Sequence, residues 1–335
     1  MRMSALREVA ELVFTVKTPL AVLSGERAVQ DVDFVVKGGE IYFIDWEKVR
    51  LEDVAASDRE VDFNKIVEAV RQRPQSFKWT KRCEGAVGGK EIHVGGPPPA
   101  SSIKGLLRTA YLYYRLKNDP KLLENFRDEL DKNFKDKQKD IVRNLNPNVR
   151  PKDVARDAEK SVFKQCIDNV LCFDVFSLVA VWQRGVEGEI PCVVYEVRVG
   201  DKSVFIKAVP PEVRLIYKVA VREHGRIGGR AGVSISLGEL KKALEEFSRD
   251  LVEFEKSRGV EVPCEKGVRL GWGAGRRWKT VLNLLCANER FGDVLLKIQN
   301  LMRIQLGRPW GDATVKYVVY GGREVPIGWA CYEWR

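Results

Sequence analysis

Histidine is scarce in this chain, and its scarcity limits the metal sites that the chain can build. The 335 residues include two histidines, His93 and His224. An imidazole-based metal site usually needs several histidines, so we expect no multi-histidine centre. We expect neither a bound metal nor any other cofactor.

Long apolar runs are also absent. No stretch of about 18 consecutive apolar residues occurs, so no transmembrane helix is expected. The first residues, Met-Arg-Met-Ser-Ala-Leu-Arg-Glu-Val-Ala-Glu, carry acids and lack the apolar core of a signal peptide. These absences lead us to expect a cytoplasmic protein with no membrane partner.

Cys-x-x-Cys pairs are absent, although the chain has seven cysteines. They stand at positions 83, 166, 172, 192, 264, 286 and 331. The odd number and wide spacing argue against a zinc ribbon and against a secreted disulfide framework. We expect these cysteines to act as buried small hydrophobic residues. Disulfides are the alternative if the source is a hyperthermophile, which the charged content of 31% would suit.

The charge balance is moderately basic. The chain has 57 Lys and Arg against 47 Asp and Glu, a net charge of +10. This excess alone fits an ordinary solvated surface, so it becomes informative only where cations stand beside glycines and aromatics. With 335 residues, of which 44% are hydrophobic, the chain suits two domains with packed cores.

Strand-like and helix-like patterns alternate in blocks along the chain. We expect strands over residues 11–17, 33–37, 41–45, 91–94, 170–182, 191–199, 204–209, 215–221, 268–270, 314–319 and 329–332. We expect helices over residues 60–72, 101–116 and 237–257 and near 279–288. Gly38-Gly39 predicts a hairpin, and Gly321-Gly322 predicts a turn between the last two strands. This order favours an α+β fold with antiparallel sheets over a doubly wound parallel sheet.

Two domains are expected, over residues 1–182 and 183–335. The first would contain a highly charged helical insertion at about 117–168, whose alternating charge signs are typical of solvated helices. The second would contain the glycine-rich loop at 271–280.

That loop belongs to residues 269–280, Arg-Leu-Gly-Trp-Gly-Ala-Gly-Arg-Arg-Trp-Lys-Thr. Glycine lets backbone N–H groups approach a phosphate, because no Cβ is in the way. Cations at an expected helix start add positive charge, and the two indoles offer stacking faces. The residues that we expect to contact an RNA backbone here are Gly271, Gly273, Gly275, Arg276, Arg277 and Lys279.

Nucleotide-binding signatures fit this loop poorly. A phosphate loop needs glycine where Trp278 stands, and in the dinucleotide-binding fingerprint the third glycine would come one residue later than Gly275. A purely structural loop is the main alternative to RNA binding.

A second segment with similar chemistry, residues 97–108, lies about 170 residues earlier. Three prolines stop regular structure, and Ser101 or Ser102 can then cap the expected helix. The helix N–H groups, the two serine hydroxyls, Lys104 and Arg108 can converge on a phosphate. The alternative is an ordinary capped helix with a solvated basic face.

These segments resemble signatures of the CRISPR RAMP superfamily. Residues 95–108 resemble its P-x-S-S-[IL]-K-G-x-[LI]-R motif, and residues 268–280 resemble its glycine-rich L-G-x-G-x-G-x-x-x-K-T loop. Residues 17–25, 33–45 and 326–329 resemble three further motifs in the same order. The trailing Lys-Thr is most similar to the head, or capping, subunit of type III-A Csm complexes.

The resemblance implies two ferredoxin-like (RRM-like) domains and a non-catalytic subunit that binds the 3′ part of a CRISPR RNA (crRNA). It implies as partners the repeated backbone RAMP subunit and the small helical subunit of the effector. It also implies a role in crRNA maturation, through recruited host nucleases.

A RAMP-type endoribonuclease that processes precursor crRNA is the alternative. It shares the fold and the glycine-rich loop, and it uses metal-independent attack by the ribose 2′-OH, commonly aided by His, Tyr or Lys. His93 would be the catalytic candidate here. The charged insertion and the Lys-Thr pair favour the capping subunit.

Overall fold

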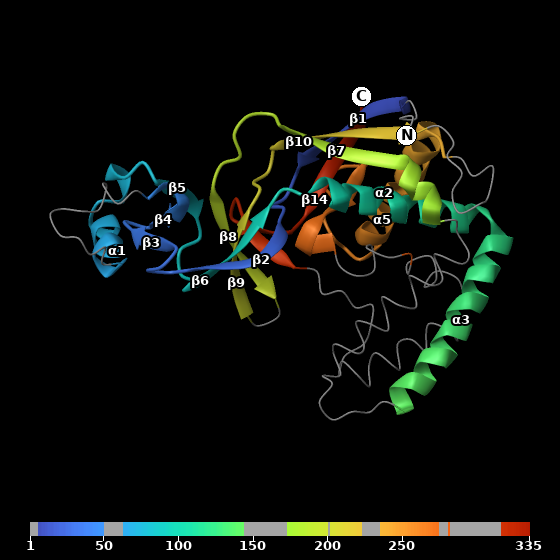
Figure 1. Cartoon of the computed structure of the whole chain (residues 1–335), viewed down its shortest axis with the longest axis horizontal. Coiled ribbons are helices and arrows are strands. Elements are labelled where there is room, and N and C mark those ends of the chain that lie inside the picture. Colours follow the sequence, from blue (N-terminus) through green and yellow to red (C-terminus); the bar gives the residue numbers. More distant parts are fainter. Residues whose placement is uncertain are drawn as a thin grey trace, which may run out of the picture.

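The described part of the chain folds into two β-sheets with helices packed on them. The computed structural model describes residues 6–49, 63–143, 173–199, 202–222, 235–274, 281 and 316–335. Within this part, helices and largely antiparallel sheets combine in an α+β fold, as expected (Figure 1).

The first sheet has five strands in the order β11-β14-β1-β10-β7, and all its pairings are antiparallel. Its strands are β1 (Leu6–Val16), β7 (Val179–Val186), β10 (Arg214–Arg222), β11 (Gly267–Arg269) and β14 (Trp329–Trp334). The central strand β1 alternates, so that Leu12, Phe14 and Val16 point to one face and join the main hydrophobic core.

Two helices cover that face: α2 (Ala100–Asn118) and α5 (Leu237–Ser257). α5 begins with a capping box, in which the Ser236 hydroxyl accepts a hydrogen bond from the Glu239 N–H and the Glu239 carboxylate accepts one from the Ser236 N–H. The Tyr113 hydroxyl on α2 donates to the Asp250 carboxylate on α5 at 2.6 Å, which joins the two helices. Helices and sheet thereby form one packed body.

The second sheet has the order β2-β6-β9-β8-β5-β4-β3. Its strands are β2 (Val22–Val29), β3 (Phe34–Lys37), β4 (Glu40–Ile44), β5 (Thr80–Gly85), β6 (Glu91–Gly96), β8 (Val193–Val199) and β9 (Lys202–Ala208), and a hairpin of β12 (Tyr317–Tyr320) and β13 (Arg323–Pro326) pairs with β8. The β5–β8 and β6–β9 pairings are parallel. The expectation of antiparallel sheets therefore holds fully for the first sheet only. In the second sheet, long chain segments separate β5 from β8 and β6 from β9, and such segments permit parallel pairing.

A small lobe, defined as residues 34–49 and 63–85, lies at the left of Figure 1. It contains β3, β4, β5 and helix α1 (Phe63–Gln72), with its own core around Tyr42, Val70 and Trp79. Gly38 and Gly39 have φ values of 60° and 79°, as a two-residue hairpin turn requires. The predicted hairpin is thus confirmed.

Helix α3 (Pro120–Arg143) extends away from the body at the right of Figure 1. Phe126 and Leu130 in its first half are buried in the main core. The helical prediction for 117–168 is confirmed over this part, and residues 144–168 lie outside the described residues. Short 3-10 helices are η1 (Trp46–Lys48), η3 (Pro74–Ser76), η4 (Phe173–Leu178) and η5 (Gly271–Ala274).

Two disulfides join segments that are distant in sequence. Cys83 in β5 bonds to Cys192 beside β8, and Cys264 before β11 bonds to Cys331 in β14. The spacing favoured unpaired, buried cysteines, but these four cysteines form disulfides, which was the alternative. The other three lie outside the described residues.

Some expected elements differ from the structure. The strand expected over 170–182 begins only at Val179, because η4 precedes it. Gly321-Gly322 leads into β13 rather than β14. Strand β13 was not predicted, because its sequence Arg-Glu-Val-Pro does not alternate apolar and polar residues. Of the helix expected near 279–288, only buried Val281 is described. Both sheets take strands from either side of residue 182, so the predicted domain boundary does not separate the sheets.

Candidate nucleic-acid interface

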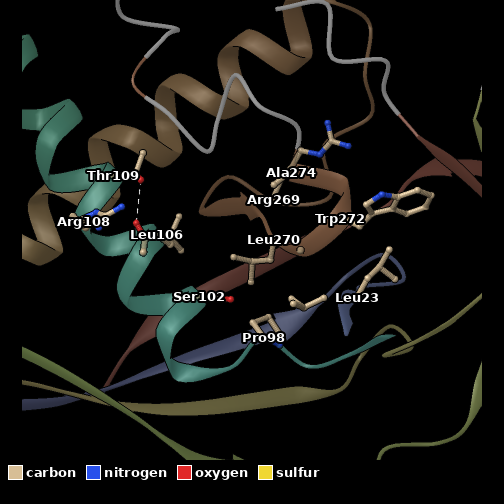
Figure 2. A pocket seen from close by; sticks show the side chains of 13 residues that line it. Leu23, Pro98, Ser102, Leu106, Arg108, Thr109, Arg269, Leu270, Trp272 and Ala274 are labelled. Atoms are coloured by element: carbon tan, nitrogen blue, oxygen red, sulfur yellow. Dashed lines mark hydrogen bonds between the residues drawn. The ribbon is translucent and has the colours of Figure 1, made fainter. Parts of the chain in front are cut away.

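The two segments singled out in the sequence meet at one cavity of about 450 Å³. It lies between the first turns of α2, the start of β2 and the residues after β11 (Figure 2). The cavity is lined by Val22, Leu23, Pro98, Ser102, Gly105, Leu106, Arg108, Thr109, Arg269, Leu270, Gly271, Trp272 and Ala274. Segments about 170 residues apart thus face one space, as a shared ligand would require.

The glycines of η5 allow two backbones to come very close. A Cβ on Gly271, whose φ is +65°, would lie 2.2 Å from the Ala21 carbonyl oxygen. A Cβ on Gly273 would lie 2.0 Å from the Ile327 carbonyl oxygen. The Trp272 N–H donates to the same Ala21 oxygen at 2.7 Å. The close approach that these two glycines permit in the described structure is therefore to the protein's own backbone.

Three of the RAMP-like motifs pack directly on one another here. The Leu270 N–H donates to the Gly328 carbonyl at 2.8 Å, and the Gly328 N–H donates to the Pro19 carbonyl at 2.9 Å. The Trp329 N–H donates to the Thr18 hydroxyl at 2.9 Å. The opening motif, the glycine-rich loop and the C-terminal Pro-Ile-Gly-Trp motif consequently form one rigid support for the cavity.

Arg269 anchors this support from within. Its guanidinium forms a buried ion pair with Glu255 of α5 at 3.2 Å and donates to the Ile327 carbonyl at 3.3 Å. Burial lowers the pKa of Arg269, and the Glu255 carboxylate opposes that effect. In Figure 2 its guanidinium points away from Ser102 and Leu106, so its charge serves the fold more than the cavity.

Helix α2 starts differently from the expectation. Its N-cap is Pro99, whose carbonyl accepts the N–H groups of Ser102 at 2.9 Å and Ile103 at 3.3 Å. The prediction that Ser101 or Ser102 caps the helix is wrong, because the extended backbone of Pro99 already ends the proline run and the helix begins at once. Both serines are exposed in the first turn, and Ser102 lines the cavity.

The basic residues of α2 divide between the cavity and its edge. Arg108 lines the cavity, whereas Lys104 is half-buried outside the lining. Burial lowers the pKa of Lys104, and the positive charges of Arg222 and Arg108 lower it further. The cations gathered here repel one another, which favours an anionic ligand.

Four predicted contacts, Gly275, Arg276, Arg277 and Lys279, lie outside the described residues and stay predictions. His93 stands in the middle of β6, paired with Arg27 of β2 and Ile206 of β9, and it is not among the cavity-lining residues. Within the described part of the chain, no group of three His, Cys, Asp or Glu could hold a metal ion. No described helix is long and apolar enough to cross a membrane.

Sequence reasoning missed several residues of the cavity. Thr109 follows Ser102 by seven positions, a helical spacing that could have placed it on the same face. Leu23 lies in the opening motif, which carried no ligand prediction. Trp272 was expected as a stacking face, and the Lys316 ammonium lies 4.5 Å from its ring centroid in a cation–π contact.

Known proteins resemble this chain in sequence and fold. No protein-family model matches it. Csm5 of Methanocaldococcus jannaschii, a CRISPR system protein, is 26% identical over an alignment 329 positions long, and the match covers 85% of this chain and 75% of the relative. A chain of a cryo-EM Csm–crRNA–target RNA ternary complex of a type III-A CRISPR-Cas system covers 97% of this chain and 100% of its own length, with a TM-score of 0.60 and 17% identity. The crystal structure of T. onnurineus Csm5 covers 95% and 99%, with a TM-score of 0.53 and 17% identity.

These likenesses confirm the resemblance that the motifs indicated. In sequence and fold the chain is similar to RAMP-type subunits of type III-A Csm systems. The particular subunit to which the matches point is Csm5.

Proposed function

We propose that this chain is a crRNA-binding structural subunit that caps a type III-A Csm effector at the 3′ end of the guide and aids crRNA maturation. The observation that carries the proposal is the cavity built jointly by residues 98–109 and 269–274. Ser102, Arg108 and Trp272 bring a hydroxyl, a cation and an indole to one place, which are the groups that bind single-stranded RNA.

The partners follow from the same proposal. The matched cryo-EM structure contains a Csm complex with crRNA and target RNA, and we extend crRNA and neighbouring Csm subunits to this chain. The repeated backbone subunit and the small helical subunit would be stable neighbours in the cytoplasm, and host nucleases would be transient ones. The two ferredoxin-like domains are part of this proposal.

Recognition should depend on phosphate and shape, because one subunit must accept guides of many sequences. Lys104 and Arg108 lie on one side of α2, where they can track a phosphate backbone without reading bases. Arg276 and Lys279 would extend this contact. Replacing both by alanine should weaken binding similarly for all sequences.

A salt series tests the proposal. The double variant Lys104→Gln/Arg108→Gln should bind single-stranded RNA more weakly. The fall of log affinity with log salt should become less steep by about 0.7 for each lost phosphate contact. Fluorescence anisotropy measures both quantities. The matched control is Lys121→Gln/Lys132→Gln, which removes two exposed cations from α3 and should leave the slope unchanged. Equal slopes in the two double variants would contradict the proposal.

The proposal makes the chain non-catalytic, and a cleavage assay tests that part. Purified protein incubated with repeat RNA in EDTA should leave the RNA intact. Discrete cleavage that disappears in His93→Ala would instead support the endoribonuclease, although His93 lies in β6 and does not line the cavity.

A further inference from the structure

One glycine of the cavity has no role that the fold explains. Gly105 lies within α2 and lines the cavity, where a helix would be more stable with alanine. A Cβ on Gly105 would meet nothing within 4 Å, whereas one on Gly271 or Gly273 would collide with backbone. The protein itself therefore leaves the space over Gly105 open. A ligand that approaches the helix backbone closely would account for glycine at this position.

The walls around this space favour a flat, apolar group. Leu23, Leu106, Leu270 and Pro98 line it, and the Ser102 hydroxyl is at its edge (Figure 2). A phosphate among these side chains would lose its hydration without adequate replacement, which is unfavourable. The volume of about 450 Å³ lies in the range of small-molecule sites, so one nucleotide can enter while a helix or strand cannot.

Positive charge lies at the border of the apolar walls, where Arg108 lines the cavity and Lys104 stands outside the lining. Lys104 is half-buried, and the charges of Arg108 and Arg222 act on it. Such an arrangement is complementary to a polyanion that passes along the edge of the cavity and turns one apolar group inward. A single-stranded nucleic acid has this combination of a charged backbone and bases with flat apolar faces, and an apolar peptide does not.

We infer that the cavity over Gly105 receives one unstacked nucleobase of a single-stranded RNA whose phosphates lie along Lys104 and Arg108. The inference rests on the proposed function and adds a base-binding subsite to it. Because its walls are largely apolar, the subsite accepts any base. It fixes the position of the strand rather than its sequence.

A comparison of two ligands tests the subsite. One is an RNA of about 12 nucleotides, within the usual range of single-strand sites, and the other is a ribose–phosphate chain of the same length without bases. The dissociation constant of the abasic chain divided by that of the RNA measures what the bases contribute to binding. Gly105→Leu should fill the cavity and reduce this ratio by about tenfold, the loss of one stacked base, while the affinity for the abasic chain stays unchanged.

The matched control is Gly238→Leu, which alters an exposed glycine near the start of α5 and should leave the ratio as in the wild type. Gly105→Ala should raise the melting temperature, which shows that the position tolerates a side chain. An unchanged ratio in Gly105→Leu would overturn the inference, because it would mean that no base enters the cavity. Failure of wild-type protein to bind either ligand would instead contradict the proposed function.

Discussion

The role of Gly271 can be tested by comparing it with a glycine of similar backbone conformation in open space. Gly271 has φ +65° and Gly321 has φ +59°, but only at Gly271 would a Cβ meet a neighbouring atom, the Ala21 oxygen at 2.2 Å. Alanine in this left-handed conformation costs about 1–2 kcal/mol at either site. At Gly271 the Ala21 carbonyl must also move, which breaks its 2.7 Å bond to the Trp272 N–H.

That broken bond costs about 0.5–1.5 kcal/mol, and the backbone shift adds about 1–3 kcal/mol. We therefore expect Gly271→Ala to lower the free energy of unfolding by about 1.5–4.5 kcal/mol more than Gly321→Ala does. Urea denaturation followed by circular dichroism measures both values. Equal losses in the two variants would refute the reasoning that links the glycine-rich loop to the packing of the opening motif.

Three further predictions concern the buried ion pair, the edge of the cavity and the disulfides. Glu255→Ala leaves the Arg269 charge buried and unpaired and should lower the free energy of unfolding by about 3–5 kcal/mol in a urea titration, whereas a loss near zero would contradict the pairing. The lowered pKa of Lys104 increases its neutral amine fraction, so amine acetylation near pH 8 should slow in Arg222→Gln, where a like charge is gone, and an unchanged rate would contradict this. Non-reducing peptide mapping should recover both disulfides, and reduction should lower stability by about 2–4 kcal/mol for each; free thiols throughout would exclude them.

Local patterns were sufficient for elements whose signals lie within a few residues. The Gly38-Gly39 turn and the amphipathic pattern of α5 are of this kind, and both occur as predicted. The predicted N-cap of α2 was wrong because proline and serine stand at adjacent positions and either can precede the first turn. The extended backbone of Pro99 makes it the N-cap. The disulfides join residues 109 and 67 positions apart, a pairing that spacing along the chain cannot specify.

The sequence predicted several residues of the candidate site but not the contacts that they make. The chemistry of Ser102 and Arg108 and their resemblance to a known motif placed both in an interface, and both line the cavity. Gly271 was expected to admit a phosphate, yet the atom that it admits in the described structure is a carbonyl oxygen of Ala21. That contact depends on long-range packing, which sequence periodicity does not contain. Gly105, whose open space became visible only in the structure, is the better candidate for ligand approach.

The most direct test of the central claim is photocrosslinking within the complex purified from its native host. Guides that carry 4-thiouridine would be crosslinked to this chain, and the joined peptides and nucleotides would be identified by mass spectrometry. The account predicts crosslinks between nucleotides near the guide 3′ end and the residues around the cavity, within 98–109 and 269–274. Crosslinks confined to the small lobe, to α3 or to the 5′ end of the guide would contradict it.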